Sequence, residues 1–256
     1  MTSDKDSVKT SEKTSMKTSD KDSMKIKKAV VLLSGGVDST TCLALAIKRH
    51  GRENVIPLSI LYGQKHKKEL EAAEKVMTYY GLTGKYLDLT EIFRFSNSPL
   101  LDQSHQNIPQ GSYAEQQRIS KHGTVATYVP FRNGLFLSAA ASMALSLGAA
   151  YLYYGAHADD AAGNAYPDCS EAFYQAMGQA VREGSGQELS LEAPFISVAK
   201  AEVVRQGLQL KVPYELTWSC YEGADKPCGH CGTCIDRAEA FRANGVDDPA
   251  VIGKST

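Results

Sequence analysis

The sequence predicts an α/β fold built on a doubly wound parallel sheet with helices on both faces. Residues 29–33 form a short, wholly apolar run with β-branched side chains, which is typical of a strand buried on both faces. Ser34, Gly35 and Gly36 then form a turn, and residues 38–49 have helical character. Because strand and helix alternate again further along the chain, the pattern favours a Rossmann-like parallel sheet.

Further strands and helices continue this alternation. The strands are expected at residues 55–61, 85–89 and 151–154, and the helices at 66–80, 132–147, 170–182 and 198–209. Residues 92–127 are polar and show no clear period. So long a connection inside a compact domain is usually functional or mobile, and we interpret it as a substrate-covering loop or an interface.

The ends of the chain differ from its centre. Residues 1–24 are a low-complexity tract of Ser, Thr, Lys and Asp, which buries too little to offset its ordering entropy, so we expect a disordered tail. Residues 25–212 are expected to form the α/β domain, and residues 213–256 a small cysteine-rich region.

The overall composition excludes some classes of protein. With 43% hydrophobic and 22% charged residues over 256 positions, the chain has the make-up of a soluble globular protein. It has no apolar run near the roughly 20 residues that a membrane span needs, and no apolar secretory signal, so we expect a cytoplasmic protein without a membrane partner. A net charge of −1 without an arginine-rich stripe argues against a nucleic-acid partner.

Residues 33–40 (LSGGVDST), between the first strand and the first helix, indicate an anion-binding loop. Gly35 and Gly36 allow the backbone to approach an anion closely, and the N–H groups at the start of the helix point toward it. Asp38 opens the helix, where its carboxylate caps the helix or helps to hold a metal beside phosphates. Hydroxyl donors at the same end come from Ser34, Ser39 and Thr40.

Two other nucleotide-binding motifs do not fit this loop. A Walker A loop needs a lysine after its last glycine, and a dinucleotide fingerprint needs the spacing G-x-G-x-x-G; the segment has neither. On Ser-Gly-Gly alone, a plain turn before a capped helix stays open as the alternative.

Four of the six cysteines crowd into residues 220–234 with the spacing C-x7-C-x2-C-x2-C. In a cytosolic protein such a cluster indicates metal chelation rather than a disulfide framework. Four thiolates leave no open coordination position, which is typical of one structural zinc ion, here in a small C-terminal helical region. The expected ligands are Cys220, Cys228, Cys231 and Cys234.

Other interpretations of the cysteines stay open. An iron–sulfur cluster is the main alternative, since C-x2-C-x2-C also occurs in ferredoxins, although the Cys-Pro ending of bacterial ferredoxins is missing; a redox C-x-x-C pair is the third. His230 lies between the ligands and is expected to face solvent. Cys42 is expected to be a small buried hydrophobe on the first helix, whereas Cys169 either packs on a helix or belongs to a pocket wall.

The string S-G-G-x-D-S-T of residues 34–40 resembles the PP-loop of the ATP pyrophosphatases, which cleave ATP between the α and β phosphates. The resemblance implies a nucleotide-binding domain of the adenine nucleotide alpha hydrolase type, ATP as co-substrate and a bridging Mg²⁺. It also implies that the loop stabilises the charge on the departing pyrophosphate. The ATP-binding residues that it implies are Leu33, Ser34, Gly35, Gly36, Val37, Asp38, Ser39, Thr40, Thr41, Cys42 and Leu43.

Further segments resemble the 7-cyano-7-deazaguanine synthases, which make the nitrile base precursor of queuosine. They are residues 62–66 (YGQKH), 128–134 (YVPFRNG), 155–160 (GAHADD), 165–169 (AYPDC) and 216–221 (LTWSCY). The likeness covers about residues 26–250, nearly everything except the tail. The substrate-binding residues that it implies are Tyr62, Gln64, His66, Arg132, Asn133, His157, Asp159, Asp160, Tyr166 and Asp168.

Asp38, Lys200 and Arg132 are the candidate catalytic groups. Arg132, placed after an expected strand ending in proline, can clamp phosphate or carboxylate through two hydrogen bonds, with a solvent-facing arginine as the alternative. Lys200 resembles a lysine that PP-loop enzymes bring to the phosphates, with an exposed helix lysine as the alternative. The neighbouring Asp159 and Asp160 either contact substrate or cap a helix.

The resemblance implies that 7-carboxy-7-deazaguanine, ammonia and two ATP give the nitrile, two AMP and two pyrophosphate. Too few residues remain for an amidotransferase domain, so free ammonia or a separate subunit would supply the nitrogen. The family likeness also suggests a homodimer.

Alternative functions remain at this point. A tRNA-thiolating PP-loop enzyme would need a catalytic thiol, for which Cys42 and Cys169 are available, and a basic RNA-binding face. A relative that attaches deazaguanine to a protein shares the same adenylation chemistry, since a fold does not fix a function. A zinc-stabilised module that binds ATP without turning it over is the non-enzyme alternative.

Overall fold

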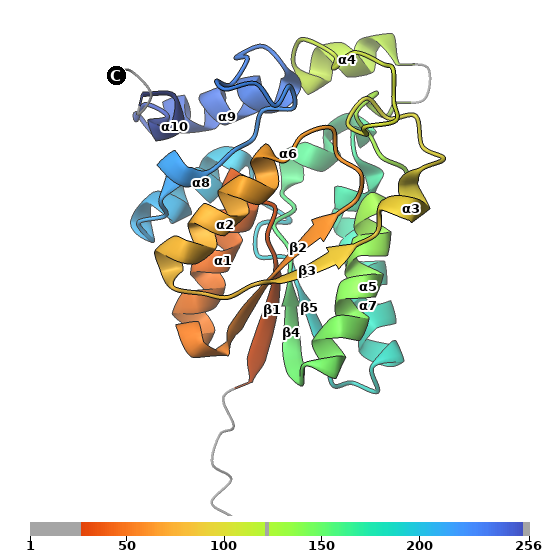
Figure 1. Ribbon diagram of the computed structural model, residues 1–256, viewed down its shortest axis with the longest axis vertical. Coiled ribbons are helices and arrows are strands. Elements are labelled where there is room, and N and C mark those ends of the chain that lie inside the picture. Colours follow the sequence, from red (N-terminus) through yellow and green to blue (C-terminus); the bar gives the residue numbers. More distant parts are fainter. Residues whose placement is uncertain (1–26, 121–122, 253–256) are drawn as a thin grey trace, which may run out of the picture.

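A computed structural model describes residues 27–120 and 123–252, and it contains the predicted parallel sheet (Figure 1). The strands are β1 (Lys28–Leu32), β2 (Val55–Leu61), β3 (Lys85–Asp88), β4 (Ala149–Tyr153) and β5 (Ser190–Glu192). They pair in parallel in the order β3-β2-β1-β4-β5, so the predicted fold class is confirmed. The tail expected over residues 1–24 lies outside the described residues.

Helices cover both faces of the sheet, with α1, α2 and α8 on one face and α5 and α7 on the other (Figure 1). The α-helices are α1 (Val37–His50), α2 (Lys68–Tyr80), α3 (Thr90–Phe93), α4 (Tyr113–Ile119), α5 (Arg132–Ser146), α6 (Ala158–Ala161), α7 (Glu171–Gly184), α8 (Lys200–Gln209), α9 (Gly232–Ala243) and α10 (Pro249–Ile252). Short 3₁₀ turns are η1 (Arg52–Asn54), η2 (Ala162–Asn164), η3 (Pro167–Cys169) and η4 (Tyr214–Leu216). Among the described residues, no helix combines the length and apolarity that crossing a membrane requires.

Some element boundaries differ from the sequence-based expectation. Helix α2 begins at Lys68 rather than at residue 66, because Gln64 first forms a bridge with Leu101 that keeps the chain extended. The strand expected before Arg132 is wrong: residues 128 and 129 are irregular and residues 130–131 form a turn, closed by a hydrogen bond from Arg132 N to Val129 O. Strand β4 begins two residues earlier than expected, and β5 was not predicted.

The winding of the chain reverses at β1. From β1 the sheet extends through β2 to β3 on one side and through β4 to β5 on the other, with Val30 of β1 paired to Leu152 of β4. In an open parallel sheet, the crevice outside the carboxyl ends of such a strand pair is the usual ligand site. The segments that follow β1 and β4 therefore meet at one edge, where α4, α9 and α10 also lie (Figure 1).

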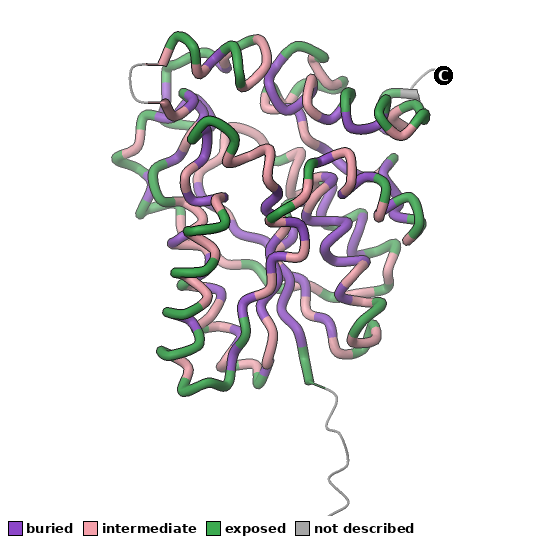
Figure 2. Tube along the Cα trace, turned by 180° about the vertical axis from the view of Figure 1, so that it is seen from behind, coloured by how far each residue is buried: buried purple, intermediate pink, exposed green. Residues whose placement is uncertain are grey.

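Apolar side chains of β1 alternate between two cores. Val30 packs with Leu137 of α5, whereas Val31 packs with Leu43 of α1 and Val203 of α8. Figure 2 shows burial along the strands and on the helix faces turned to the sheet, with exposed residues on the outer surfaces. The fully apolar run in the sequence thus follows from a strand that has no solvent-facing side.

The long segment of residues 92–127 is more structured than its sequence suggested. Helix α4 begins with a capping box, in which Glu115 N donates to Ser112 Oγ and Ser112 N donates back to a Glu115 carboxylate oxygen. Leu101 is fully buried in a cluster that also contains the C-terminal cysteines. The segment therefore packs against the C-terminal region, and its role as a substrate cover or an interface stays a prediction.

A buried arginine of α9 holds the C-terminal region together. Arg237 forms paired bonds with Asp248, at 2.6 Å from Nε to Oδ2 and 2.8 Å from Nη2 to Oδ1. It also donates to Thr217 Oγ1 (2.9 Å) and to the Tyr214 carbonyl (3.2 Å). Removing one partner of such a pair leaves an uncompensated buried charge.

We expect Asp248→Ala to lower the free energy of unfolding by about 3 kcal/mol, because the Arg237 guanidinium loses its counter-charge. Denaturant titration measures the change. The matched control is Asp247→Ala at the neighbouring exposed position, which should shift the same quantity by less than about 0.5 kcal/mol. Equal effects of the two substitutions would contradict the role assigned to the ion pair.

Candidate active site and metal centre

The loop after β1 is held by its own hydroxyl groups. Ser34 Oγ and Ser39 Oγ lie 3.0 Å apart, and Ser39 Oγ also donates to the Gly36 carbonyl (3.3 Å). Gly36, not Asp38, occupies the N-cap position of α1, so no N-cap side chain satisfies the first N–H groups. Such amides at a helix start form a ready site for an anion.

Two glycines make this geometry possible. Gly35 has a φ of +85°, and a Cβ there would lie 2.5 Å from Ala73 N and from Glu69 O of α2. Gly155, shortly after β4, approaches α1 so closely that a Cβ would lie 2.9 Å from the Asp38 carbonyl carbon. Any side chain at either position would push the loop away from its neighbours.

A cavity of about 250 Å³ opens next to this loop. The predicted ATP-binding residues in its wall are Leu33, Ser34, Gly36, Asp38 and Ser39. The others are buried behind the wall: Gly35, Val37, Thr40, Thr41, Cys42 and Leu43. Cys42 is thus confirmed as a core side chain, while Cys169 lies in the cavity wall.

The predicted substrate-binding residues also divide into two groups. Those in the cavity wall are Tyr62, Gln64, Arg132, Asn133, Asp160 and Tyr166, and those outside it are His66, His157, Asp159 and Asp168. Asp168 Oδ2 accepts a hydrogen bond from Asn133 N (2.8 Å), and Asp159 Oδ2 accepts one from Lys200 N (2.7 Å). These two carboxylates therefore hold residues of the wall in place.

Lys200, at the start of α8, is only 5% exposed, so the exposed lysine considered from the sequence is wrong. Its Nζ lies 3.2 Å from Asp38 Oδ2 and 2.8 Å from Asp236 Oδ2. Burial lowers the pKa of a lysine, but the two carboxylates more than offset that effect, and the pKa of Lys200 is raised. The ammonium group beside the loop of residues 33–40 therefore stays charged.

Asp38 also faces the fully buried His157. His157 Nε2 lies 3.7 Å from Asp38 Oδ1 and 3.4 Å from Asp160 Oδ2. Burial alone would raise the pKa of the Asp38 carboxyl, but Lys200 and His157 hold it below its ordinary value. The pKa of Asp160 is raised by burial in spite of the same two neighbours. Asp38 is therefore a fixed anion, whereas Asp160 binds a proton more readily.

Arg132 opens α5 and lines the cavity. Its Nη1 donates to Tyr62 Oη at 3.3 Å, and its guanidinium carbon lies 5.2 Å from the centre of the Tyr62 ring. Phe131, at the N-cap, has a φ of +54°, an uncommon backbone conformation for an aromatic residue. This turn places the arginine, with its bidentate donors, at the cavity.

Sequence reasoning missed several residues of the site. In the cavity wall they are Glu69, Tyr113, Trp218, Tyr221 and Thr233. Outside the wall there is Asp236, whose carboxylate pairs with Lys200 Nζ. Trp218 and Tyr221 lie in the segment 216–221 that carries the family likeness, so that segment was a usable signal. No sequence signal marked Tyr113, Glu69 or Asp236, because a polar residue on a helix looks the same in the sequence whether it faces a cavity or solvent.

Three tyrosines and one glutamate line part of the cavity wall. Tyr221 Oη lies 2.9 Å from Tyr113 Oη and 3.4 Å from Tyr166 Oη. Glu69, on the first turn of α2, has its carboxyl pKa raised by burial, although His66 and Arg132 act in the opposite direction. The wall thus offers aromatic faces, hydroxyl groups and an acid, which suits a flat, polar heterocycle.

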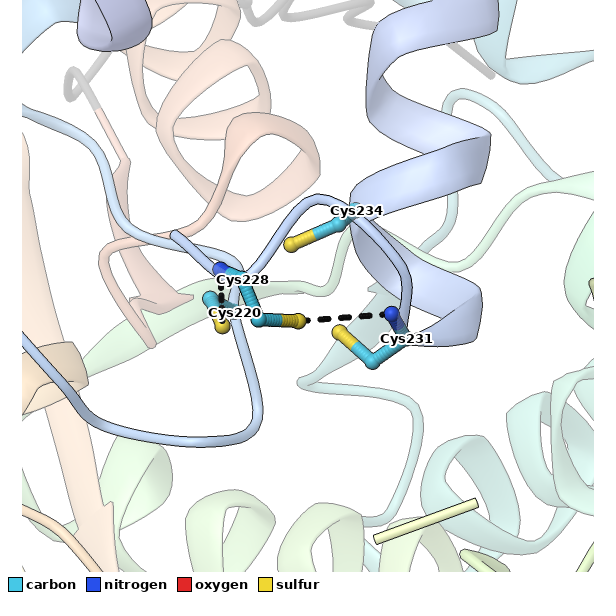
Figure 3. Close-up of side chains that lie close together, drawn as sticks. All are labelled: Cys220, Cys228, Cys231 and Cys234. Atoms are coloured by element: carbon cyan, nitrogen blue, oxygen red, sulfur yellow. Dashed lines mark hydrogen bonds between the residues drawn. The ribbon is translucent and has the colours of Figure 1, made fainter. Parts of the chain in front are cut away.

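The four cysteines of the predicted metal site lie together, with their sulfur atoms within 4.8 Å of one another. Figure 3 shows their side chains turned toward one another, with Cys234 at the start of α9. Cys228 N donates to Cys220 Sγ and Cys231 N donates to Cys228 Sγ, each at 3.3 Å. Four thiolates in this arrangement fit a tetrahedral metal ion. His230 is exposed, as expected from the sequence.

We expect Cys228→Ser to lower the bound metal and the melting temperature together, because a metal held only by the folded chain adds its binding free energy to folding. Native mass spectrometry and calorimetry measure the two quantities. The control is His230→Ala, an exposed position between the ligands, which should change neither. Loss of the metal at an unchanged melting temperature would show that the site is not structural.

A doubly wound sheet with the S-G-G-x-D-S-T loop at its switch point defines a PP-loop α/β protein. A family model described as "Queuosine biosynthesis protein QueC" matches residues 28–245. The chain is 45% identical over 222 residues to a 7-cyano-7-deazaguanine synthase of Caldicellulosiruptor bescii, across 87% of this chain and 96% of the relative. The corresponding enzyme of Archaeoglobus fulgidus is 44% identical over 224 residues, across 87% and 89%. The chain therefore belongs to the QueC family of 7-cyano-7-deazaguanine synthases.

Solved structures resemble the chain more distantly. An NMN synthetase from Francisella tularensis aligns with a TM-score of 0.47 and 15% identity, over 87% of this chain and 79% of that one.

Proposed function

We propose that this protein converts 7-carboxy-7-deazaguanine and ammonia into 7-cyano-7-deazaguanine (preQ0), with two ATP each split into AMP and pyrophosphate. The names of the relatives support the product. The observation that carries the ATP-dependent part is the buried Lys200–Asp38 pair beside the uncapped start of α1, where a phosphate chain would lie.

The first step activates the substrate. A carboxylate is a poor electrophile, because oxide is a poor leaving group. A carboxylate oxygen therefore attacks the α phosphorus of ATP, and the bond to the bridging oxygen of pyrophosphate breaks. Lys200 and the helix-start amides stabilise the charge that develops on pyrophosphate. Arg132, beside Tyr62, orients the carboxylate through paired hydrogen bonds.

The following steps install the nitrogen. Ammonia attacks the acyl carbon, AMP departs and a proton is lost, which leaves the amide. The amide oxygen then attacks the α phosphorus of a second ATP and expels pyrophosphate. The nitrogen then loses both of its protons as AMP departs, which forms the C≡N bond. Both oxygens of the original carboxylate thus leave on the two AMP molecules.

Two metal ions belong to the proposal. Zinc, held by the four cysteines, would fix the fold of the C-terminal region without touching substrate. Mg²⁺ would take most of its ligands from phosphates and water. Asp38 Oδ1, a buried oxygen without a hydrogen-bond partner, is suited to bind it.

The remaining predicted residues take two kinds of role in the proposal. Direct contacts with the base come from Gln64, Asn133, Asp160 and Tyr166 in the wall. Support of those contacts comes from His66, His157, Asp159 and Asp168. We further propose that ammonia arrives free or from a separate subunit. The chain would work as a homodimer in the cytoplasm. Residues 25–212 and 213–256 would form the two units expected from the sequence.

The purified protein should release AMP and pyrophosphate from ATP only when 7-carboxy-7-deazaguanine is present, and mass spectrometry should detect the nitrile once ammonia is added. Transfer RNA in place of the deazapurine is the control and should release neither product. Formation of ADP and orthophosphate, or release that depends on tRNA, would refute the proposal.

Asp38→Asn should keep the fold and reduce substrate-dependent AMP formation by about 100-fold or more, because it removes the fixed charge that holds Lys200 at the phosphates. Circular dichroism checks the fold, and a coupled pyrophosphate assay checks the rate. Lys48→Gln, exposed on the same helix, is the control and should leave the rate unchanged. A rate for Asp38→Asn within threefold of the original would contradict the role of Asp38.

A tRNA-thiolating activity is less well supported. Burial raises the pKa of the Cys42 thiol and of the Cys169 thiol, which disfavours the thiolate that sulfur transfer requires. Cys42 is also fully buried, away from the cavity. Neither Cys42 nor Cys169, the two cysteines outside the group of four, is thus activated as a nucleophile.

A further inference from the structure

Asp236 connects the candidate metal centre with the candidate active site. It lies on α9, two residues after Cys234, and its Oδ2 is 2.8 Å from Lys200 Nζ. The second carboxylate on the same ammonium group is Asp38 of α1, at 3.2 Å. Lys200 is thus held by acids from two helices that are far apart in the sequence.

We infer that Asp236 is a positioning residue that fixes Lys200 Nζ beside the phosphate loop, and that the cysteine cluster sets the place of Asp236. Helix α9 begins at its N-cap, Cys231, and carries Cys234 in its first turn, so two of the four clustered thiols determine where the helix starts. Thr233, in the same turn, lines the cavity. This inference rests on the phosphate role proposed for Lys200.

The need for a second acid follows from the lysine side chain. Its stem has four rotatable bonds and its ammonium is a point charge, so a single carboxylate draws it without fixing its direction. With Asp38 alone, the ammonium would stay near the loop but could turn away from the phosphates. Contacts of α8 with both α1 and α9 keep the two acids in register with Lys200. A shift of about 1 Å in such a group can cost about 100-fold in rate.

We expect Asp236→Asn and Asp236→Ala to lower kcat for substrate-dependent AMP release by about 10- to 100-fold, with KM for ATP changed by less than about threefold. Asp236→Glu, which keeps the charge, should recover part of the loss. Glu239→Gln, exposed on the same helix, is the matched control and should behave like the original protein. If the original protein releases AMP and Asp236→Ala has the same kcat, the inference about Asp236 is overturned while the proposed function stands.

A double-mutant cycle separates positioning from an independent role. In the Lys200→Ala background, Asp236→Asn should cause no further loss of kcat, because its effect passes through the lysine. An equal further loss in that background would overturn the inference. Each Asp236 variant should bind as much metal as the original protein. Loss of the metal in these variants would also overturn the inference.

Crystal structures of the original protein and of Asp236→Ala give a readout that does not depend on activity. Lys200 Nζ should move by about 1 Å or more once Asp236 is removed. If Nζ does not move, the positioning role is overturned, whatever reaction the protein catalyses. If Nζ moves but the protein never forms AMP, the positioning role stands and only the proposed function is refuted.

Discussion

The chain winds in opposite directions from β1, so the connections after β1 and β4 run to opposite faces of the sheet. They leave a crevice between them at the carboxyl ends of these two strands. The loop of residues 33–40 lines one side of the crevice, and the segment that contains Gly155 and Asp160 lines the other. Gly155 has no side chain, so the two segments come close enough for His157 to reach Asp38. The arrangement of strands thus decides where charged groups converge.

A buried ammonium group makes strict demands on what surrounds it. Removing Lys200 from water is costly unless counter-charges lie close by in fixed positions. Asp38 comes from α1 and Asp236 from α9, so the C-terminal region must close over the sheet edge before the charge is compensated. The hydrogen bond from Trp218 N to the Gly35 carbonyl attaches the start of that region directly to the loop of residues 33–40. The cysteine cluster, in turn, sets the start of α9.

Most of the sheet was predictable because a strand buried on both faces leaves a distinct apolar signature, as in residues 29–33. The exceptions have local reasons. Strand β5 has only three residues, too few for a period to show. Residues 128–130 look like a strand that ends in proline, yet turn hydrogen bonds and the left-handed Phe131 carry the chain into α5. Helix α2 starts late because Gln64 is paired with Leu101.

The sequence by itself determined strands β1 to β4, the glycine-containing loop after β1, the cysteine spacing and the resemblance to one family, since each of these is a pattern of neighbouring residues. Only the tertiary structure decided which polar side chains face the cavity. The family resemblance made Lys200 a candidate, but its burial and its two carboxylate partners are not visible in the sequence. Asp236 looks like a solvent-facing helix residue there, and Tyr113 lies in a segment without a period. The physical reason is that the burial and pairing of a charge depend on segments brought together by folding, and no local pattern records them.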